Sequence, residues 1–417
     1  MTLPFPQKWA NASTDRRAPT TEENANGFPC GAADPNLFDW LFNADQDAIN
    51  KIARQVEYAA LQVGMTYSTD DETILDDILK TYKDIISEDR VLNVPADFTD
   101  PADAMDYLSR FRISNDATVI INCASGVYNL GSKVISGHPD GLRIKILGPA
   151  LPSGMVTEAN FQVTGYSGAN IATDRIVNDN MLRGRFSVII MSTNGAVDTG
   201  TSDITLENLC FIGSGANEGI KTTGGYVRAT NVSVHNYYND WLVDRGGIIY
   251  APGCTASGAV ADGFNVTNNG TIVNEGGVSS GNGGSGYTAS VGGTVVASSA
   301  TAKGNGNVDG GGFFVSLSGI IQARAAVSKN NAGSGYLITN DGFIQAREST
   351  SQNNGSHGYS VFNGGRLNAA ESTSGSQVGN DYRCSNFGAM TITGYGGTAS
   401  ASPTVNTVGN GNCYIKN

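Results

Sequence analysis

The chain has 417 residues, a formal net charge of −12, only 15% charged residues and 54 glycines. Apolar residues make up 40% of the chain, which argues against a disordered protein. The glycines follow no strict three-residue period, which excludes collagen, and no run of about 18 uncharged apolar residues predicts a membrane span.

Charge and glycine content divide the chain near residue 110. Residues 1–110 hold 20 Asp and Glu, 9 Lys and Arg, and only 3 glycines. Residues 111–417 hold 18 Asp and Glu, 17 Lys and Arg, and the other 51 glycines. An acidic first part and a near-neutral second part both argue against a nucleic-acid partner.

The beginning of the chain predicts a docking segment. Its first residues lack a basic stretch followed by an apolar one, so we expect no Sec signal peptide. Residues 1–36 carry no sustained period, and the segment 1–44 is expected to be extended. The cysteines are too sparse and irregular for a disulfide scaffold or a zinc site, and we expect buried thiols in a chain that folds in a reducing cell. They are Cys30, Cys123, Cys210, Cys254, Cys384 and Cys413.

Residues 45–110 predict short helices. Apolar residues recur in steps of three and four over 49–63, as in a short coiled-coil seam or an ordinary amphipathic helix. A second helix is expected over 69–86, opening with the capping box Thr-Asp-Asp-Glu. A third, over 101–110, has Asp100 as its N-cap and proline at its first position, and its apolar side could plug the end of the following domain.

A repeat of 23 residues runs through the remaining sequence. Aromatic residues recur at spacings of 23, 23, 26, 23, 23 and 23, and a glycine column shows the same single insertion. Within each repeat, apolar residues alternate at period two, which predicts strands whose inward side chains stack from one repeat to the next. The aromatic column consists of Trp241, Phe264, Tyr287, Phe313, Tyr336, Tyr359 and Tyr382.

These columns predict a mostly β protein with a parallel β-helix over residues 111–417. Left-handed helices built on hexapeptides use about 18 residues per turn, so 23 residues favour right-handed winding. The pairs Asn330-Asn331 and Asn353-Asn354 fall in turns, where asparagine tolerates left-handed backbone and can form hydrogen-bonded ladders between rungs.

One polar strip has groups that suit sugars. Glu348 and Glu371 are 23 residues apart, so they should be stacked ~4.8 Å apart, close to the ~5–5.5 Å of a retaining glycosidase. They are weak catalytic candidates, because Arg324 and Arg347 beside them would keep both carboxylates ionised. The same residues could form a structural charge ladder or a trimer contact. The candidate ligand-binding residues are Gln322, Arg324, Gln345, Arg347, Asn368 and, from the densest aromatic run, Tyr237 and Tyr238.

No cofactor or metal site is predicted. The three histidines lie far apart and in unrelated positions of the repeat. No glycine-rich loop stands between a strand and a helix, as phosphate binding would need.

The whole arrangement resembles bacteriophage tail fibres and tailspikes that carry a pectate-lyase-like β-helix. The segment Gly27–Phe42 is similar to their virion-attachment segments. The segment Ala104–Gly148, with His138-Pro139-Asp140-Gly141 before a strand, is similar to the entry of their β-helical shafts.

This resemblance implies a homotrimeric protein of the virion tail that folds in the host cytoplasm. Residues 1–44 would attach it to a tail or baseplate protein, residues 45–110 would form the trimer neck, and the shaft would bind a host surface glycan or another receptor. Two alternatives stay open. One is a tailspike depolymerase, a glycosidase or lyase that acts on capsule or lipopolysaccharide. The other is a secreted β-helical adhesin, which should show an export signal or a translocator domain.

Overall fold

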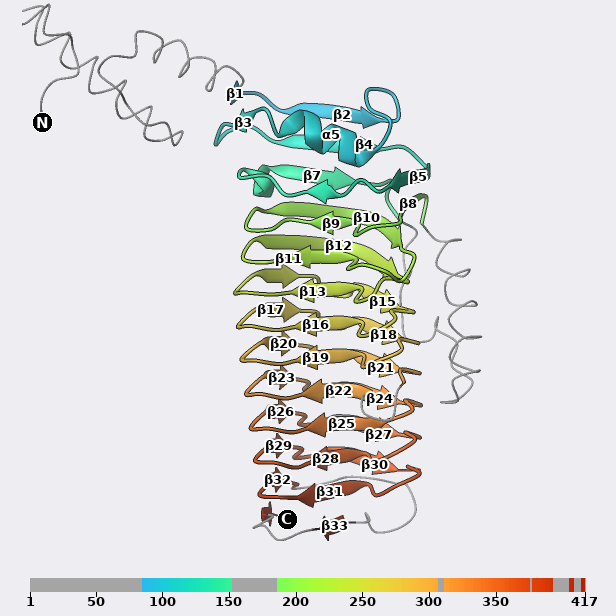
Figure 1. Ribbon diagram of the computed structural model, residues 1–417, viewed down its shortest axis with the longest axis vertical. Coiled ribbons are helices and arrows are strands. Elements are labelled where there is room, and N and C mark those ends of the chain that lie inside the picture. The colour runs from blue at the N-terminus through green and yellow to red at the C-terminus, as the bar shows by residue number, and fades with distance from the viewer. Residues whose placement is uncertain are drawn as a thin grey trace, which may run out of the picture. The chain divides into compact units, whose positions relative to one another are not determined.

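The computed structural model describes residues 85–151, 186–306, 311–375 and 377–392, together with the backbones of residues 405–408 and 414–416. Residues from Ile86 onward form one compact unit, a β-solenoid of about 12 turns with about 23 residues per turn (Figure 1). The predicted parallel β-helix is thereby confirmed, while right-handed winding and trimer formation stay predictions. The segment 1–44 and the helical patterns at 49–63 and 69–84 lie outside the described residues.

The first sheet of the solenoid contributes one parallel strand to each turn. Its strands follow one another in register, so that Ile272 pairs with Val295 and Ile321 pairs with Ile344. The strands are β2 (Arg90–Val94), β4 (Val119–Cys123), β7 (Ile144–Leu147), β10 (Ile204–Ile212), β12 (Tyr226–His235), β14 (Ile248–Tyr250), β17 (Thr271–Val273), β20 (Thr294–Val296), β23 (Ile320–Gln322), β26 (Phe343–Gln345), β29 (Arg366–Asn368), β32 (Ala389–Thr391) and β34 (Tyr414–Lys416).

The second sheet continues from the first without a break at β10 and β12, which are long enough to take part in both. It otherwise consists of β5 (Gly126–Gly131), β8 (Val188–Ser192), β15 (Thr255–Ser257), β18 (Val278–Ser280), β21 (Thr301–Lys303), β24 (Val327–Lys329), β27 (Thr350–Gln352) and β30 (Thr373–Gly375).

The third sheet is 11-stranded and closes each turn. It carries the aromatic column at an inward position of its later strands. Its members are β6 (Ile135–Ser136), β9 (Val197–Asp198), β11 (Ile220–Thr222), β13 (Trp241–Val243), β16 (Phe264–Val266), β19 (Tyr287–Ala289), β22 (Gly311–Val315), β25 (Ser334–Ile338), β28 (Tyr359–Val361), β31 (Tyr382–Ser385) and β33 (Val405–Val408).

Stacked side chains fill the interior as the repeat predicts. The seven aromatic rings of the column are buried, and neighbouring rings lie nearly parallel with centroids 4.7–5.7 Å apart. Offset stacking of this kind adds to the stabilisation from apolar burial. The aliphatic positions expected inside are also buried: Val266, Ile272, Ile321, Ile344 and Leu367.

A buried asparagine ladder follows the corner between the second and third sheets. The Nδ2 atom of Asn305 donates to Oδ1 of Asn331 at 3.0 Å, and Asn331 donates to Asn354 at 2.9 Å. The backbone N–H of Asn331 also donates to the Asn354 Oδ1 atom, at 3.1 Å. The ladder expected at Asn331 and Asn354 is confirmed, and Asn330 before it has the left-handed φ of 55° that its turn requires.

A short helix closes the N-terminal end of the solenoid. Helix α5 (Pro101–Leu108) has Asp100 as its N-cap, whose side chain accepts from the Asp103 N–H at 2.9 Å. Met105 and Leu108 are buried in the solenoid core, so the predicted third helix and its plugging role are confirmed.

The predicted start of the solenoid at residue 111 is wrong. Strand β2 pairs in parallel with β4, so the turns begin before α5, and residues 86–110 belong to the solenoid unit rather than to a separate neck. The sequence predicts that the second helix ends at Ile86. Instead, Ile85–Ile86 form β1, which pairs with β3 (Arg112–Ile113). The first turn of the solenoid is acidic and poor in glycine, unlike the later repeats, so the sequence pattern did not predict its strands.

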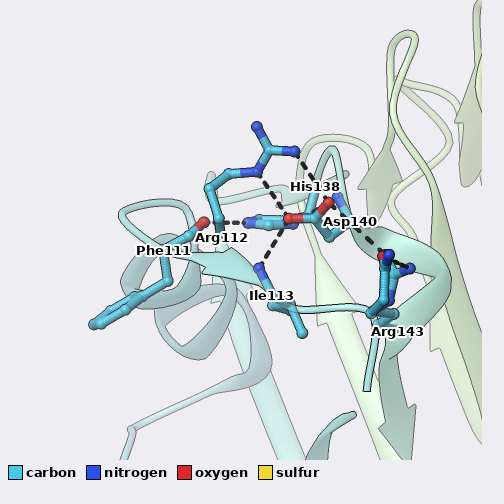
Figure 2. A network of polar contacts seen from close by, with 7 residues as sticks. Phe111, Arg112, Ile113, His138, Asp140 and Arg143 are labelled. Atoms are coloured by element: carbon cyan, nitrogen blue, oxygen red, sulfur yellow. Dashed lines mark hydrogen bonds and ion pairs between the residues drawn. The ribbon is translucent and has the colours of Figure 1, made fainter. Parts of the chain in front are cut away.

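The segment that resembles a shaft entry is a structural joint (Figure 2). It contains the 3-10 helix η1 (Gly141–Arg143), and its Asp140 Oδ2 atom accepts from Arg112 Nε and from the Ile113 N–H, both at 2.9 Å. His138 Nδ1 accepts from the Asp140 N–H, so Nε2 carries the proton and donates to the Phe111 carbonyl at 3.0 Å. Burial raises the pKa of Asp140. The hydrogen bonds from Arg112 and Ile113, with the nearby positive charge of Arg112, outweigh this effect and hold the pKa below its ordinary value.

The cysteines differ from the prediction at one position. Cys123, Cys210 and Cys254 are buried free thiols, as expected. Cys384 is disulfide-bonded, so the prediction that all six are thiols is wrong there.

Candidate functional site

The polar strip predicted from the repeat lies on the outer side of the first sheet, near its C-terminal end. Gln322 pairs in register with Gln345, which pairs with Asn368, so their side chains form one column. Each is next to an inward residue of the same strand, and the buried Ile321, Ile344 and Leu367 hold this column outward. The alternation of side chains along each strand points the amides outward, and the register of the strands places them one rung apart, ~4.8 Å.

The charged members of the strip form ion pairs across successive corners. Arg324 Nη2 lies 2.8 Å from Glu348 Oε1, and Arg347 Nη2 lies 2.7 Å from Glu371 Oε1. Arg347 Nε is also 3.5 Å from Glu348 Oε1, which links the two pairs. Both glutamates occupy left-handed corner positions, with φ of 60° and 59°.

This arrangement suits binding rather than proton transfer. The hydrogen bond from Arg324 lowers the pKa of Glu348, and this effect exceeds the opposing effect of desolvation. A retaining glycosidase needs one of its two carboxyl groups protonated near neutral pH. Glu348 is instead held as a carboxylate, so it is not suited to supply that proton.

Two of the three amides of the strip are available to a ligand, whereas the Asn368 Oδ1 atom already accepts from the Ala370 N–H at 3.2 Å. Among the described residues, no side-chain hydrogen bond engages Gln322 or Gln345. Gln322 is exposed and Gln345 half-buried, with Ile320 and Phe343 as the neighbouring outward side chains on the same strands. An amide offers both a donor and an acceptor, as a row of sugar hydroxyls requires.

The two tyrosines predicted as contact residues have different surroundings. Tyr238 is 47% exposed and can contact a ligand. Tyr237 is 1% exposed, and its hydroxyl lies 3.0 Å from Ser192 Oγ. Its assignment as a surface contact is therefore wrong.

A further column of polar residues was missed by the sequence analysis. It lies at the corner before the third sheet, two residues ahead of the inward column. Asp262 Oδ1 accepts from the Ser285 N–H at 2.7 Å, and Glu218 Oε2 accepts from the Asn239 N–H at 3.0 Å. Burial raises the pKa of Asp262 to about 6 and also raises that of Glu218. The fixed offset from the aromatic column was the signal that could have identified this column.

The described part of the chain contains no group of three or more His, Cys, Asp or Glu residues that could hold a metal ion. Over the same residues, no helix has the length and apolar character needed to cross a bilayer. Comparisons with protein-family models, with curated proteins and with solved structures gave no match.

Proposed function

We propose that this chain is a bacteriophage tail fibre protein, a homotrimer of the virion tail whose solenoid binds a glycan of the host cell surface. The carrying observation is the column of Gln322, Gln345 and Asn368, whose outward amides repeat once per rung beside ion-paired arginines. A rigid row of donors and acceptors at this spacing can hold an extended polysaccharide without changing shape.

The other parts of this proposal come from the resemblance. Residues 1–44 would attach the fibre to a tail or baseplate protein, and the host cytoplasm would be the place of folding. Residues 1–44 lie outside the described residues, and the place of folding is an inference from the resemblance alone.

The glycan assignment is tested by equilibrium binding of the full chain to a panel of bacterial capsule and lipopolysaccharide preparations. We expect the parent to bind at least one preparation, and the double variant Gln322→Ala/Gln345→Ala to bind it at least tenfold more weakly. Gln352→Ala is a matched control, because Gln352 is an exposed amide on β27 of the second sheet. A parent that binds none of them, or a double variant that binds like the control, would contradict the assignment.

A depolymerase of the same fold is the second candidate, and Asp262 is the observation that favours it. A carboxyl group with a pKa of about 6 can donate a proton near neutral pH, as glycoside hydrolysis requires. Both of its oxygens already accept hydrogen bonds, from Ser285 N–H and from Asn265 Nδ2 at 3.2 Å, which favours a structural role. New reducing ends that the parent releases and Asp262→Asn does not would establish the depolymerase instead.

A further inference from the structure

One charged side chain stands on the outer side of the first sheet between β14 and β29. The central residue of each of these strands is buried, so the residues on either side of it point outward. Arg366 on β29 is the single charged group among these outward side chains, and it is exposed. Within the part of the chain that the structure describes, its guanidinium forms neither an ion pair nor a hydrogen bond. Arg366 is therefore free to bind an anion.

The other charges at this end of the sheet do not balance Arg366. The two arginines of the polar strip already have carboxylate partners, in Glu348 and Glu371. Asp341 stands at the corner before β26, where its carboxylate lies over Gly364, and it makes no ion pair with Arg366. Arg366 is thus a cation without a counter-ion in contact, on the strand that follows Gln345 in the glycan column.

An aromatic side chain lies beside this guanidinium. Phe343 on β26 pairs in register with Arg366, as Gln345 pairs with Asn368, so the ring and the guanidinium are one rung apart, ~4.8 Å. Phe343 and Gln345 are the two outward side chains of β26, and both are half-buried. A sugar ring has an apolar side made of C–H groups and a rim of hydroxyls. Phe343 therefore suits the side of such a ring, and the amides suit its hydroxyls.

A neutral sugar on this surface would leave the charge of Arg366 unbalanced. Covering an ionised guanidinium with a neutral ligand removes water from it without supplying an opposite charge, and this costs free energy. A carboxylate can accept two parallel N–H bonds from an arginine, and charge-assisted pairs of this kind are short and strong. Uronic acids carry such a carboxylate on the sugar ring itself.

We propose that the glycan bound along β23, β26 and β29 is acidic, with the ring of a uronic acid on Phe343 and its carboxylate bound by Arg366. This inference deepens the proposed function and rests on it, because it names the chemical class of the glycan that the amide column binds. The carboxylate site is local, so an arginine elsewhere on the sheet should not share its role. Arg228 on β12, several turns earlier, is also exposed and, among the described residues, forms no ion pair.

Equilibrium binding of the full chain to capsule polysaccharides that contain uronic acid tests the inference. Each polymer is used in its native form and after its carboxyl groups have been reduced to alcohols. We expect the parent to bind at least one native polymer, and the reduced form of that polymer at least tenfold more weakly. Arg366→Gln should bind the native polymer at least tenfold more weakly than the parent, with an unchanged melting temperature and no remaining preference for the native form. Arg228→Gln removes the same charge from the same sheet and should bind like the parent.

The outcomes separate this inference from the proposed function. A parent that binds only neutral polysaccharides, with binding lost in Gln322→Ala/Gln345→Ala, would overturn the acidic ligand and leave the glycan site standing. An Arg366→Gln variant that keeps the preference for the native polymer would overturn the role of Arg366, as would equal losses in Arg366→Gln and Arg228→Gln. Equally tight binding of a polymer whose only anions are phosphodiesters would overturn the carboxylate assignment. A parent that binds no polysaccharide would contradict the proposed function as well.

Discussion

The rings of Phe313 and Tyr336 lie one rung apart in the core, with centroids 4.8 Å apart and planes 5° from parallel. The backbones of β22 and β25 pair in register at the same two residues. Each turn is therefore held to the next by a backbone ladder outside and a side-chain stack inside. This relationship recurs along the aromatic column, so removal of one ring affects the contacts with two neighbours.

We predict that Phe313→Ala lowers the free energy of unfolding by about 3–5 kcal/mol, because it opens a cavity within the stack. Phe314→Ala is a matched control on the same strand, since the Phe314 side chain points outward and is half-buried. It should cost less than half as much in denaturant unfolding followed by circular dichroism. Equal losses would contradict the assigned inward register.

The buried asparagine ladder should also be sensitive to substitution, with a smaller loss of stability than the aromatic stack. Asn331→Ala removes a side chain that both donates and accepts, and it leaves the buried backbone N–H of Asn305 without its acceptor, at a cost of about 1–3 kcal/mol. Asn363→Gly is the control, because the Asn340–Asn363–Asn386 ladder is exposed, its bonds are 3.4 and 3.3 Å long, and glycine adopts the φ of 50° at this position without strain. That change should stay within about 0.5 kcal/mol in the same unfolding experiment.

The joint at Asp140 should stabilise the terminal turn in a pH-dependent way. The pKa of Asp140 is lower in the folded state, so its contribution is present above pH ~4 and is lost as the pH falls through the folded value. Asp140→Asn should therefore melt below the parent at pH 7, with the difference closing in strong acid. Melting curves for both proteins across this range provide the measurement, and a difference that does not depend on pH would count against the charge.

Asp262 should have the opposite pH dependence. Its pKa rises from an ordinary value near 3.8 to about 6 on folding, so its protonated form is favoured and stability falls as the pH rises between these values. Asn239 occupies the same column one rung earlier, which shows that an amide fits there. Asp262→Asn should melt above the parent at pH 7.5 and approach it at pH 4. A variant that melts below the parent at pH 7.5 would contradict this account.

The repeat could be predicted from the sequence because each rung requires the same kind of side chain at the same position, for example an aromatic residue that stacks in the core. The inward column from Trp241 to Tyr382 and the outward amides at Gln322 and Gln345 both follow from this periodicity. The first turns were harder to predict, since α5 interrupts them and their spacing is irregular. Tyr237 shows the consequence. Its ring occupies space left by Gly213 and Gly219, where a Cβ atom would lie 2.4 Å and 2.8 Å from it.

The pKa of Asp262 could not be predicted for a different reason. Sequence spacing places it at a corner two residues before Phe264, but burial sets its pKa, and burial depends on how neighbouring corners pack.

The most direct test of the account is a structure of the full chain bound to an oligosaccharide from a capsule or lipopolysaccharide preparation that it binds. The account predicts sugar rings along Gln322, Gln345 and Asn368, at a spacing set by the rungs, with the glycosidic bonds intact. Sugar bound along another sheet, or a cleaved product beside Asp262, would contradict the claim that this column is the attachment site.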